Sequence, residues 1–176
     1  VMPPASRRGL IIIYTGNGKG KTTAALGAVF RALGHGWRVA VLHFFKGDWP
    51  VVFGELEMGK RLFPQLEILQ VGKGFVKHMG DKKPFEEHVA AAQDALRIAK
   101  EKIASGEYDL IVLDELIYAI DYAGVQLVTL DEVLSLLDAK PPSLHLVLTG
   151  RNAPQALIDR ADLVTEMREI QHPWQQ

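Results

Sequence analysis

Residues 15–23 combine glycines, lysines and threonines at a spacing that can hold a triphosphate. In order they are Thr15-Gly16-Asn17-Gly18-Lys19-Gly20-Lys21-Thr22-Thr23. The glycines allow backbone N–H groups to point at an anion, Lys21 brings a positive charge, and the Thr22 hydroxyl is placed to ligate Mg²⁺. A helix that begins here would add its positive N-terminal end. These properties predict a phosphate-binding loop.

The flanking residues help to distinguish this loop from a surface turn rich in glycine and lysine. An apolar, β-branched run precedes it, Leu10-Ile11-Ile12-Ile13-Tyr14, as expected of a strand buried on both faces. A helix-like run follows. The general pattern G-x-x-x-x-G-K-[ST] has a glycine where this chain has Thr15, but Gly16 and Gly18 keep the loop flexible. The context therefore favours the phosphate-binding loop over the surface turn.

Two carboxylates and an arginine follow later apolar runs. Asp114 and Glu115 come directly after residues 110–113, a pattern typical of a Walker B strand, although an ordinary strand with a polar end has the same appearance. A magnesium ion held by phosphates and by Thr22 needs a hard anionic oxygen on its other side. Arg151 follows another such run, where its planar guanidinium can reach a phosphate or form a surface ion pair.

The composition narrows the function classes. The chain has 176 residues, of which 48% are hydrophobic, and we expect one domain over 10–170, with a flexible lead-in over 1–9 and a short tail over 171–176. Lys and Arg number 20 against 21 Asp and Glu, which argues against a nucleic-acid partner. No apolar stretch reaches about 18 residues, so no membrane partner is expected. The lack of cysteine excludes thiol chemistry and suits a cytoplasmic protein.

Apolar runs alternate with helical patterns, which predicts an α/β fold with a mostly parallel six-stranded sheet and helices on both faces. The expected strands are 10–15, 38–44, 67–71, 109–114, 144–149 and 163–167. The clearest helix is 84–105, with an apolar stripe of Phe85, Val89, Ala92, Leu96, Ala99 and Ile103. Another helix starts at Thr129, where a capping box is expected. The stretch 72–83 is either a lid over a ligand or a solvated loop.

Several short segments of the chain, taken together, are more specific for one protein family than the phosphate-binding loop alone. They are the loop at 15–25, Lys46-Gly47 with Trp49-Pro50, Gly74-Phe75, Leu113-Asp114-Glu115-Leu116 with Tyr118, and Leu148-Thr149-Gly150-Arg151. The combination resembles the corrinoid adenosyltransferases of the CobA/BtuR type, from about residue 10 to His172. The resemblance implies a RecA-like P-loop fold, usually a homodimer. It also implies transfer of the 5′-deoxyadenosyl group of ATP to the Co(I) of cob(I)alamin or cob(I)yrinic acid a,c-diamide, with release of triphosphate.

The resemblance assigns an expected role to each matching residue. ATP, Mg²⁺ and a corrinoid are the expected ligands, and a reductase or flavodoxin-like protein is the expected electron donor. Phosphate contacts are expected from Gly16, Asn17, Gly18, Lys19, Gly20, Lys21, Thr22, Thr23 and Arg151, with Lys21 and Arg151 as catalytic charges. Thr22, Asp114 and Glu115 are the expected metal ligands, and Phe75 and Trp49 are the expected corrinoid contacts.

The sequence differs from the family pattern in the expected lid. The family commonly has a second aromatic residue where this chain has Lys77. Trp49 or Phe53 from the preceding loop can substitute for it, although a Trp followed by a Pro is more often a simple packing residue. From the residues alone, two other functions stay open. One is a P-loop NTPase or small-molecule kinase that uses ATP in the conventional orientation, and the other is a non-catalytic corrinoid- or nucleotide-binding module.

Overall fold

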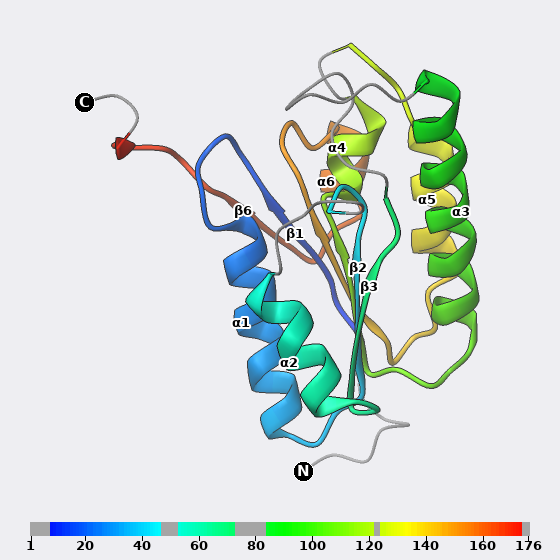
Figure 1. The fold of residues 1–176 in the computed structure, drawn as a ribbon. Coiled ribbons are helices and arrows are strands. Elements are labelled where there is room, and N and C mark those ends of the chain that lie inside the picture. The colour runs from blue at the N-terminus through cyan, green and yellow to red at the C-terminus, as the bar shows by residue number, and fades with distance from the viewer. Residues whose placement is uncertain (1–7, 47–52, 73–83, 122–123, 174–176) are drawn as a thin grey trace.

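Six strands form one sheet in which each neighbouring pair is parallel (Figure 1). The computed structural model describes residues 8–46, 53–72, 84–121 and 124–173. The strand order is β3-β2-β4-β5-β1-β6. The strands are β1 (Ile11–Thr15), β2 (Val39–His43), β3 (Leu66–Gln70), β4 (Leu110–Asp114), β5 (His145–Thr149) and β6 (Leu163–Glu166). All six predicted strands are confirmed, with ends shifted by no more than one residue, and the sheet is wholly rather than mostly parallel.

Helices cover both faces of the sheet, as predicted (Figure 1). On one face lie α1 (Lys21–Gly34) and α2 (Gly54–Leu62). On the other face lie α3 (Phe85–Ala104), α4 (Leu116–Ile120), α5 (Leu130–Asp138) and α6 (Gln155–Ile158). The apolar side chains of the central strands are divided between the two resulting cores. Because both faces are covered, the central strands β2 and β4 are buried along their whole length.

The predicted helices agree with the structure, apart from one side chain. In α3 the stripe residues Ala92, Leu96, Ala99 and Ile103 are buried, but Phe85, the first residue of the helix, is 39% exposed. The helix α5 follows Thr129, whose hydroxyl accepts a hydrogen bond from the N–H of Glu132 at 3.2 Å and whose N–H donates to the Glu132 carboxylate at 2.7 Å. The expected capping box is therefore confirmed.

Other details differ from what the sequence suggests. The helices α2, α4 and α6, with nine, five and four residues, are not among the elements that the sequence predicted. In β1 the side chains of Ile12 and Tyr14 are only half-buried, so this strand is not buried on both faces. The expected lid lies, from residue 73 onward, outside the described residues.

The carboxyl ends of four adjacent strands meet at one edge of the sheet, the upper edge in Figure 1. The register pairs His43 with Asp114, and it pairs Tyr14 with Thr149. Asp114 also comes directly after Leu113, which pairs with Leu148, so Asp114 and Thr149 are level with each other. Residues in one row of a sheet point to the same face. The topology therefore brings His43, Asp114 and Thr149 together beside the loop that follows β1.

Candidate active site

The loop between β1 and α1 has the glycine conformations that a phosphate-binding loop requires. Gly16 and Gly20 have φ values of 97° and 105°, a region that strongly favours glycine. Thr15 still belongs to β1, and its hydroxyl accepts a hydrogen bond from the N–H of Ala153 at 3.1 Å. The first left-handed residue of the loop is therefore Gly16, and threonine at position 15 causes no backbone strain.

The segment after β6 packs against this loop. The N–H of Gly18 donates to the carbonyl oxygen of Met167 at 2.8 Å. A Cβ atom at Gly16 would lie 2.4 Å from that same oxygen, and one at Gly18 would lie 2.7 Å from the carbonyl carbon of Arg168. Such distances are too short for any side chain, so close backbone contact is a second reason for glycine at these positions.

Lys21 spans the loop from the first residue of α1. Its Nζ donates to the carbonyl oxygens of Gly16 and Gly18, both at 2.7 Å. Burial lowers the pKa of the Lys21 ammonium, and the positive charge of Arg151 lowers it further. The ammonium is therefore held at the mouth of the loop by carbonyl oxygens, which a triphosphate can replace with stronger, charged partners.

Asp114 is the centre of a buried hydrogen-bond network. It is 1% exposed, and its Oδ1 accepts from the hydroxyls of Thr22 and Thr149, both at 2.8 Å. Its Oδ2 lies 2.8 Å from Nδ1 of His43. Burial alone would raise the pKa of Asp114, but the hydrogen bond and the charge of His43, with help from Lys46, hold the pKa below its usual value. Asp114 is therefore ionised and has protein partners on both oxygens.

Glu115 differs from Asp114 in having an oxygen without a partner. Its Oε2 is buried and has no hydrogen-bond partner among the described residues. Burial and the negative charge of Asp114 raise the pKa of Glu115 to about 7. Its backbone has a φ of 65°, outside the regions that non-glycine residues prefer, and its N–H donates to the Thr149 hydroxyl at 2.8 Å. The structure thus holds an unsatisfied carboxylate in a strained position beside Asp114.

These residues fit a magnesium ion. No three His, Cys, Asp or Glu side chains within residues 8–46, 53–72, 84–121 and 124–173 group together as a metal site. Magnesium does not need such a set, because it usually binds one or two carboxylates together with substrate phosphates and water. The unpartnered oxygen of Glu115 and the Thr22 hydroxyl are hard oxygen donors of this kind.

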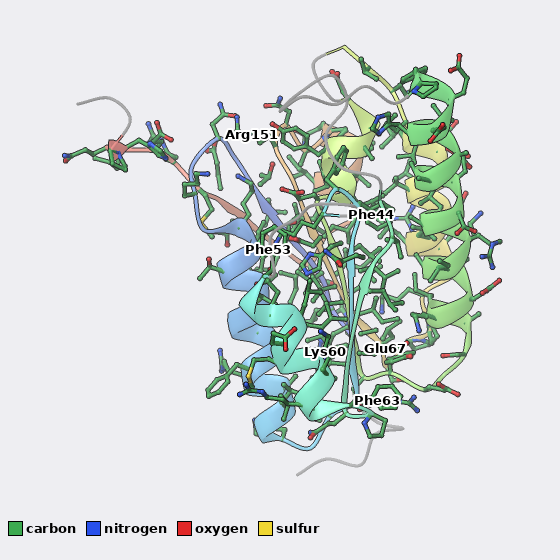
Figure 2. The ribbon with its side chains drawn as sticks, viewed as in Figure 1. Phe44, Phe53, Lys60, Phe63, Glu67 and Arg151 are labelled. Carbon is green, nitrogen blue, oxygen red and sulfur yellow. The ribbon has the colours of Figure 1, made fainter. Side chains whose placement is uncertain are left out.

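A pocket of about 330 Å³ opens above the phosphate-binding loop. It is lined by Gly18, Lys19, Gly20, Lys21, Thr22, Thr23, Glu115, Tyr118, Thr149, Gly150 and Arg151. The Arg151 guanidinium lies 5.8 Å from the ring centroid of Tyr118, a cation–π distance. Figure 2 shows Arg151 near the end of the molecule where the loop turns into α1. Lysine and arginine side chains and one carboxyl group therefore line the same pocket.

The structure brings most of the predicted nucleotide residues together. Of these residues, Gly16, Asn17 and Asp114 are not among those that line the pocket. Gly16 shapes the loop, Asn17 is exposed on it, and Asp114 lies beneath the pocket. Phe75 and Trp49 lie outside the described residues, so the predicted corrinoid contacts stay predictions.

Sequence reasoning gave no role to three residues of the site. Tyr118 and Thr149 stood in the segments that carry the resemblance, but their contacts were not predicted. His43 stands outside the motifs of the sequence, and the structure shows it buried and bonded to Asp114. Its position as the last residue of a strand, next to Asp114 in the sheet, is the signal that could have identified it.

Comparison with known proteins bears on the family of the whole chain. The family described as ATP:corrinoid adenosyltransferase BtuR/CobO/CobP matches residues 7–176. The corrinoid adenosyltransferase of Escherichia coli K12 is 36% identical over 165 residues, which covers 94% of this chain and 79% of that protein. The corrinoid adenosyltransferase CobA of Salmonella typhimurium is 39% identical over 166 residues, with 94% and 79% covered. One from Sinorhizobium sp. is 40% identical over 168 residues, with 95% and 75% covered.

Solved structures support the fold. The flagellar accessory protein FlaH of Methanocaldococcus jannaschii has a TM-score of 0.60 at 16% identity, covering 91% of this chain and 71% of that one. A KaiC-like protein of Pyrococcus horikoshii has a TM-score of 0.57 at 14% identity, covering 93% and 75%. At such identities the likeness concerns the RecA-like fold alone. No described helix is long and apolar enough to span a membrane. The match over nearly the whole chain shows that this protein belongs to the ATP:corrinoid adenosyltransferase family.

Proposed function

We propose that this chain transfers the 5′-deoxyadenosyl group of ATP to the Co(I) of a corrinoid and releases triphosphate, a reaction of adenosylcobalamin synthesis or salvage. Cob(I)alamin and cob(I)yrinic acid a,c-diamide are the proposed corrinoids. The observation that carries the proposal is one pocket in which Lys21, Thr22, Glu115 and Arg151 converge, within a chain of this family. The groups are suited to holding a triphosphate and its metal ion.

In this proposal the loop holds the triphosphate. The loop residues 16–20, with Lys21, Thr22 and Thr23, surround its oxygens from the α1 side, and Arg151 reaches it from the end of β5. The N-terminus of α1 adds a favourable backbone field. Lys21 exchanges the carbonyls of Gly16 and Gly18 for phosphate oxygens, because an ammonium binds an anion more strongly than neutral carbonyls.

Thr22 and Glu115 are the proposed magnesium ligands, with Asp114 beneath them. When bound, Mg²⁺ supplies positive charge to the triphosphate oxygens. Asp114 accepts a hydrogen bond from the Thr22 hydroxyl, with 2.8 Å between the two oxygens. The lone pairs of the Thr22 oxygen are then left for the cation. Asp114 itself acts through Thr22 and Thr149 in this arrangement, since both of its oxygens already have protein partners.

The chemical step places little demand on acid–base groups. The electron pair of Co(I) attacks the 5′ carbon of ATP and forms the Co–C bond, while the C–O bond breaks and triphosphate leaves with its electron pair. The protein contributes alignment of cobalt with that carbon and stabilisation of the charge on the leaving group. Lys21 and Arg151 are the fixed positive groups that serve this purpose.

The corrinoid side of the proposal rests on residues outside the described ranges. Phe75 and Trp49 are proposed to pack against the corrin ring. We further propose that a reductase or flavodoxin-like protein supplies the electron that converts Co(II) to Co(I), that the chain forms a homodimer, and that it acts in the cytoplasm.

The proposal is tested by product analysis. The protein is incubated anaerobically with ATP, Mg²⁺ and chemically reduced cob(I)alamin, and both products are quantified. We expect light-sensitive adenosylcobalamin and an equal amount of triphosphate. ADP or inorganic phosphate formed without corrinoid would overturn the proposal in favour of a conventional NTPase or kinase, and tight corrinoid binding without turnover would overturn it in favour of a binding module.

A further inference from the structure

His43 lies outside every nucleotide-binding motif of the chain but is bonded to the centre of the site. It is the last residue of β2 and is 1% exposed. Its Nδ1 is 2.8 Å from Oδ2 of Asp114. Because an ionised carboxylate can only accept hydrogen bonds, Nδ1 carries a hydrogen and donates a hydrogen bond to Asp114.

Other groups from the same side of the site surround this hydrogen bond. The Nζ of Lys46 lies 3.6 Å from Oδ2 of Asp114 and 3.0 Å from Oε1 of Glu55. The Nε2 of His43 lies 4.0 Å from that same Glu55 oxygen and has no hydrogen-bond partner among the described residues. His43 is thus the close, buried donor to Oδ2, and Lys46 is a more distant charge whose nearer partner is Glu55.

The hydrogen bond from His43 fixes the orientation of the Asp114 carboxylate, with one oxygen toward β2 and the other toward the phosphate-binding loop. With Oδ2 held toward β2, Oδ1 is left to accept the hydroxyls of Thr22 and Thr149. Thr22 then presents its lone pairs to the pocket, and Thr149 is held where it accepts the N–H of Glu115. Without the donor at position 43, Oδ2 would be a buried anion lacking its hydrogen bond, and rotation of Asp114 would release both threonines.

We propose that His43 is a positioning residue that holds Asp114 so that Thr22 and Glu115 face the metal ion of bound MgATP. The inference rests on the proposed function only in requiring that the pocket binds MgATP. It predicts that loss of His43 weakens the binding of MgATP but not the binding of metal-free ATP. The reason is that His43 acts on the triphosphate only by positioning the proposed metal ligands.

Two variants separate the hydrogen bond from the volume of the side chain. His43→Leu fills the space without a donor, and His43→Asn places an amide N–H close to the position of Nδ1, the atom that contacts Asp114. Calorimetry measures the Kd of ATP for each purified protein with Mg²⁺ and again with EDTA, and circular dichroism checks folding. The ratio of the two Kd values is the gain in affinity due to magnesium.

We expect His43→Leu to reduce the magnesium-dependent gain by roughly tenfold or more, the size associated with losing a hydrogen bond to a charged group. Its Kd for metal-free ATP should stay within about threefold of the wild type, and His43→Asn should recover most of the magnesium-dependent gain. A merely structural histidine would alter folding stability without changing the ratio.

Three outcomes would overturn the inference. They are an unchanged ratio in folded His43→Leu, an equal loss in His43→Asn, and failure of both variants to fold, which would make His43 a structural residue. If the wild-type protein itself does not bind MgATP, the proposed function fails instead, so the two failures can be told apart.

Discussion

The Thr149 hydroxyl joins the two carboxylate residues of the site. It donates to Oδ1 of Asp114 and accepts the backbone N–H of Glu115, both at 2.8 Å. Thr149 comes from β5 and the two acidic residues come from the end of β4, so the contact ties neighbouring strands at the edge of the sheet. One buried hydroxyl therefore fixes a side chain and, next to it, the backbone of a strained residue.

Thr149→Val should damage both stability and metal-dependent binding. The valine fills the same volume but leaves a buried N–H and a carboxylate oxygen without this hydroxyl, which costs about 1–3 kcal/mol. Urea denaturation should show that loss, and the KM for MgATP should rise. Thr149→Ser keeps the hydroxyl and should retain most of the MgATP affinity. If the valine variant matched the wild type in both measurements, the bridge would have no energetic role.

Lys21→Ala should lower the rate of adenosyl transfer by about 10²–10³-fold, the range found when a preorganised group that stabilises developing charge is removed. The assay follows adenosylcobalamin formation from prereduced cob(I)alamin. The control is Lys60→Ala. Lys60 lies on α2, pairs with Glu57 at 2.7 Å, and is well separated from Arg151 in Figure 2, so its removal should leave the rate unchanged. Similar losses in the two variants would contradict a specific role for Lys21.

The stability of the metal-free protein should depend on the ionisation of Glu115. Its pKa is about 7 in the folded chain against a usual value of 4.5, so between these pH values the folded state binds more protons than the unfolded state. The contribution of Glu115 to the free energy of unfolding therefore falls as the pH rises from about 4.5 to 7, and it does not change further above pH 7.

Glu115→Gln removes this dependence and serves as the comparison. Denaturant unfolding in EDTA measures the free energy of unfolding of both proteins. From pH 5 to pH 8 the value for the variant should rise relative to that of the wild type by roughly 2–3 kcal/mol, at about 1.4 kcal/mol for each pH unit below pH 7. A constant difference between the two proteins across this range would show that Glu115 titrates normally.

Substitutions of Tyr118 and Arg151 should have non-additive effects on kcat/KM for ATP. The guanidinium lies 5.8 Å from the ring centroid, so the aromatic face helps to hold it over the pocket. A double-mutant cycle with Tyr118→Leu and Arg151→Ala should give a coupling of about 0.5–2 kcal/mol in kcat/KM for ATP. Tyr118→Phe keeps the aromatic face and should retain the coupling. Strictly additive losses would mean that the ring does not position Arg151.

Two glycine substitutions should have opposite effects on stability. Gly16→Ala places a Cβ 2.4 Å from the carbonyl oxygen of Met167 at a residue with a φ of +97°, and it should lower the free energy of unfolding by more than about 1 kcal/mol. Gly27 lies inside α1 with nothing within 4 Å of its Cβ position, so Gly27→Ala should stabilise by about 0.5–1 kcal/mol. Thermal unfolding measures both, and a stabilised Gly16→Ala would contradict the close contact.

Much of the fold and part of the site could be predicted because the signals are local. The strands were recognisable as short apolar runs, and α3 as a long helix with a regular apolar stripe. Lys21 and Thr22 lie in one continuous motif, and Glu115 directly follows a buried strand. The short helices α2, α4 and α6 escaped prediction, because they combine little periodicity with no side-chain cap. The helix α5 is as short as α2, but its capping box marks its start.

The sequence by itself determined that this protein carries a phosphate-binding loop, a pair of acidic residues at a strand end and the motifs of its family. Only the tertiary structure decided that Asp114 and Glu115 have different environments. His43 is 71 residues from Asp114 and Thr149 is 35 residues from it, yet the parallel register sets all three in one row. These contacts satisfy both oxygens of Asp114 and leave Oε2 of Glu115 without a partner among the described residues. That difference arises from burial and hydrogen bonding between strands, which no local pattern contains.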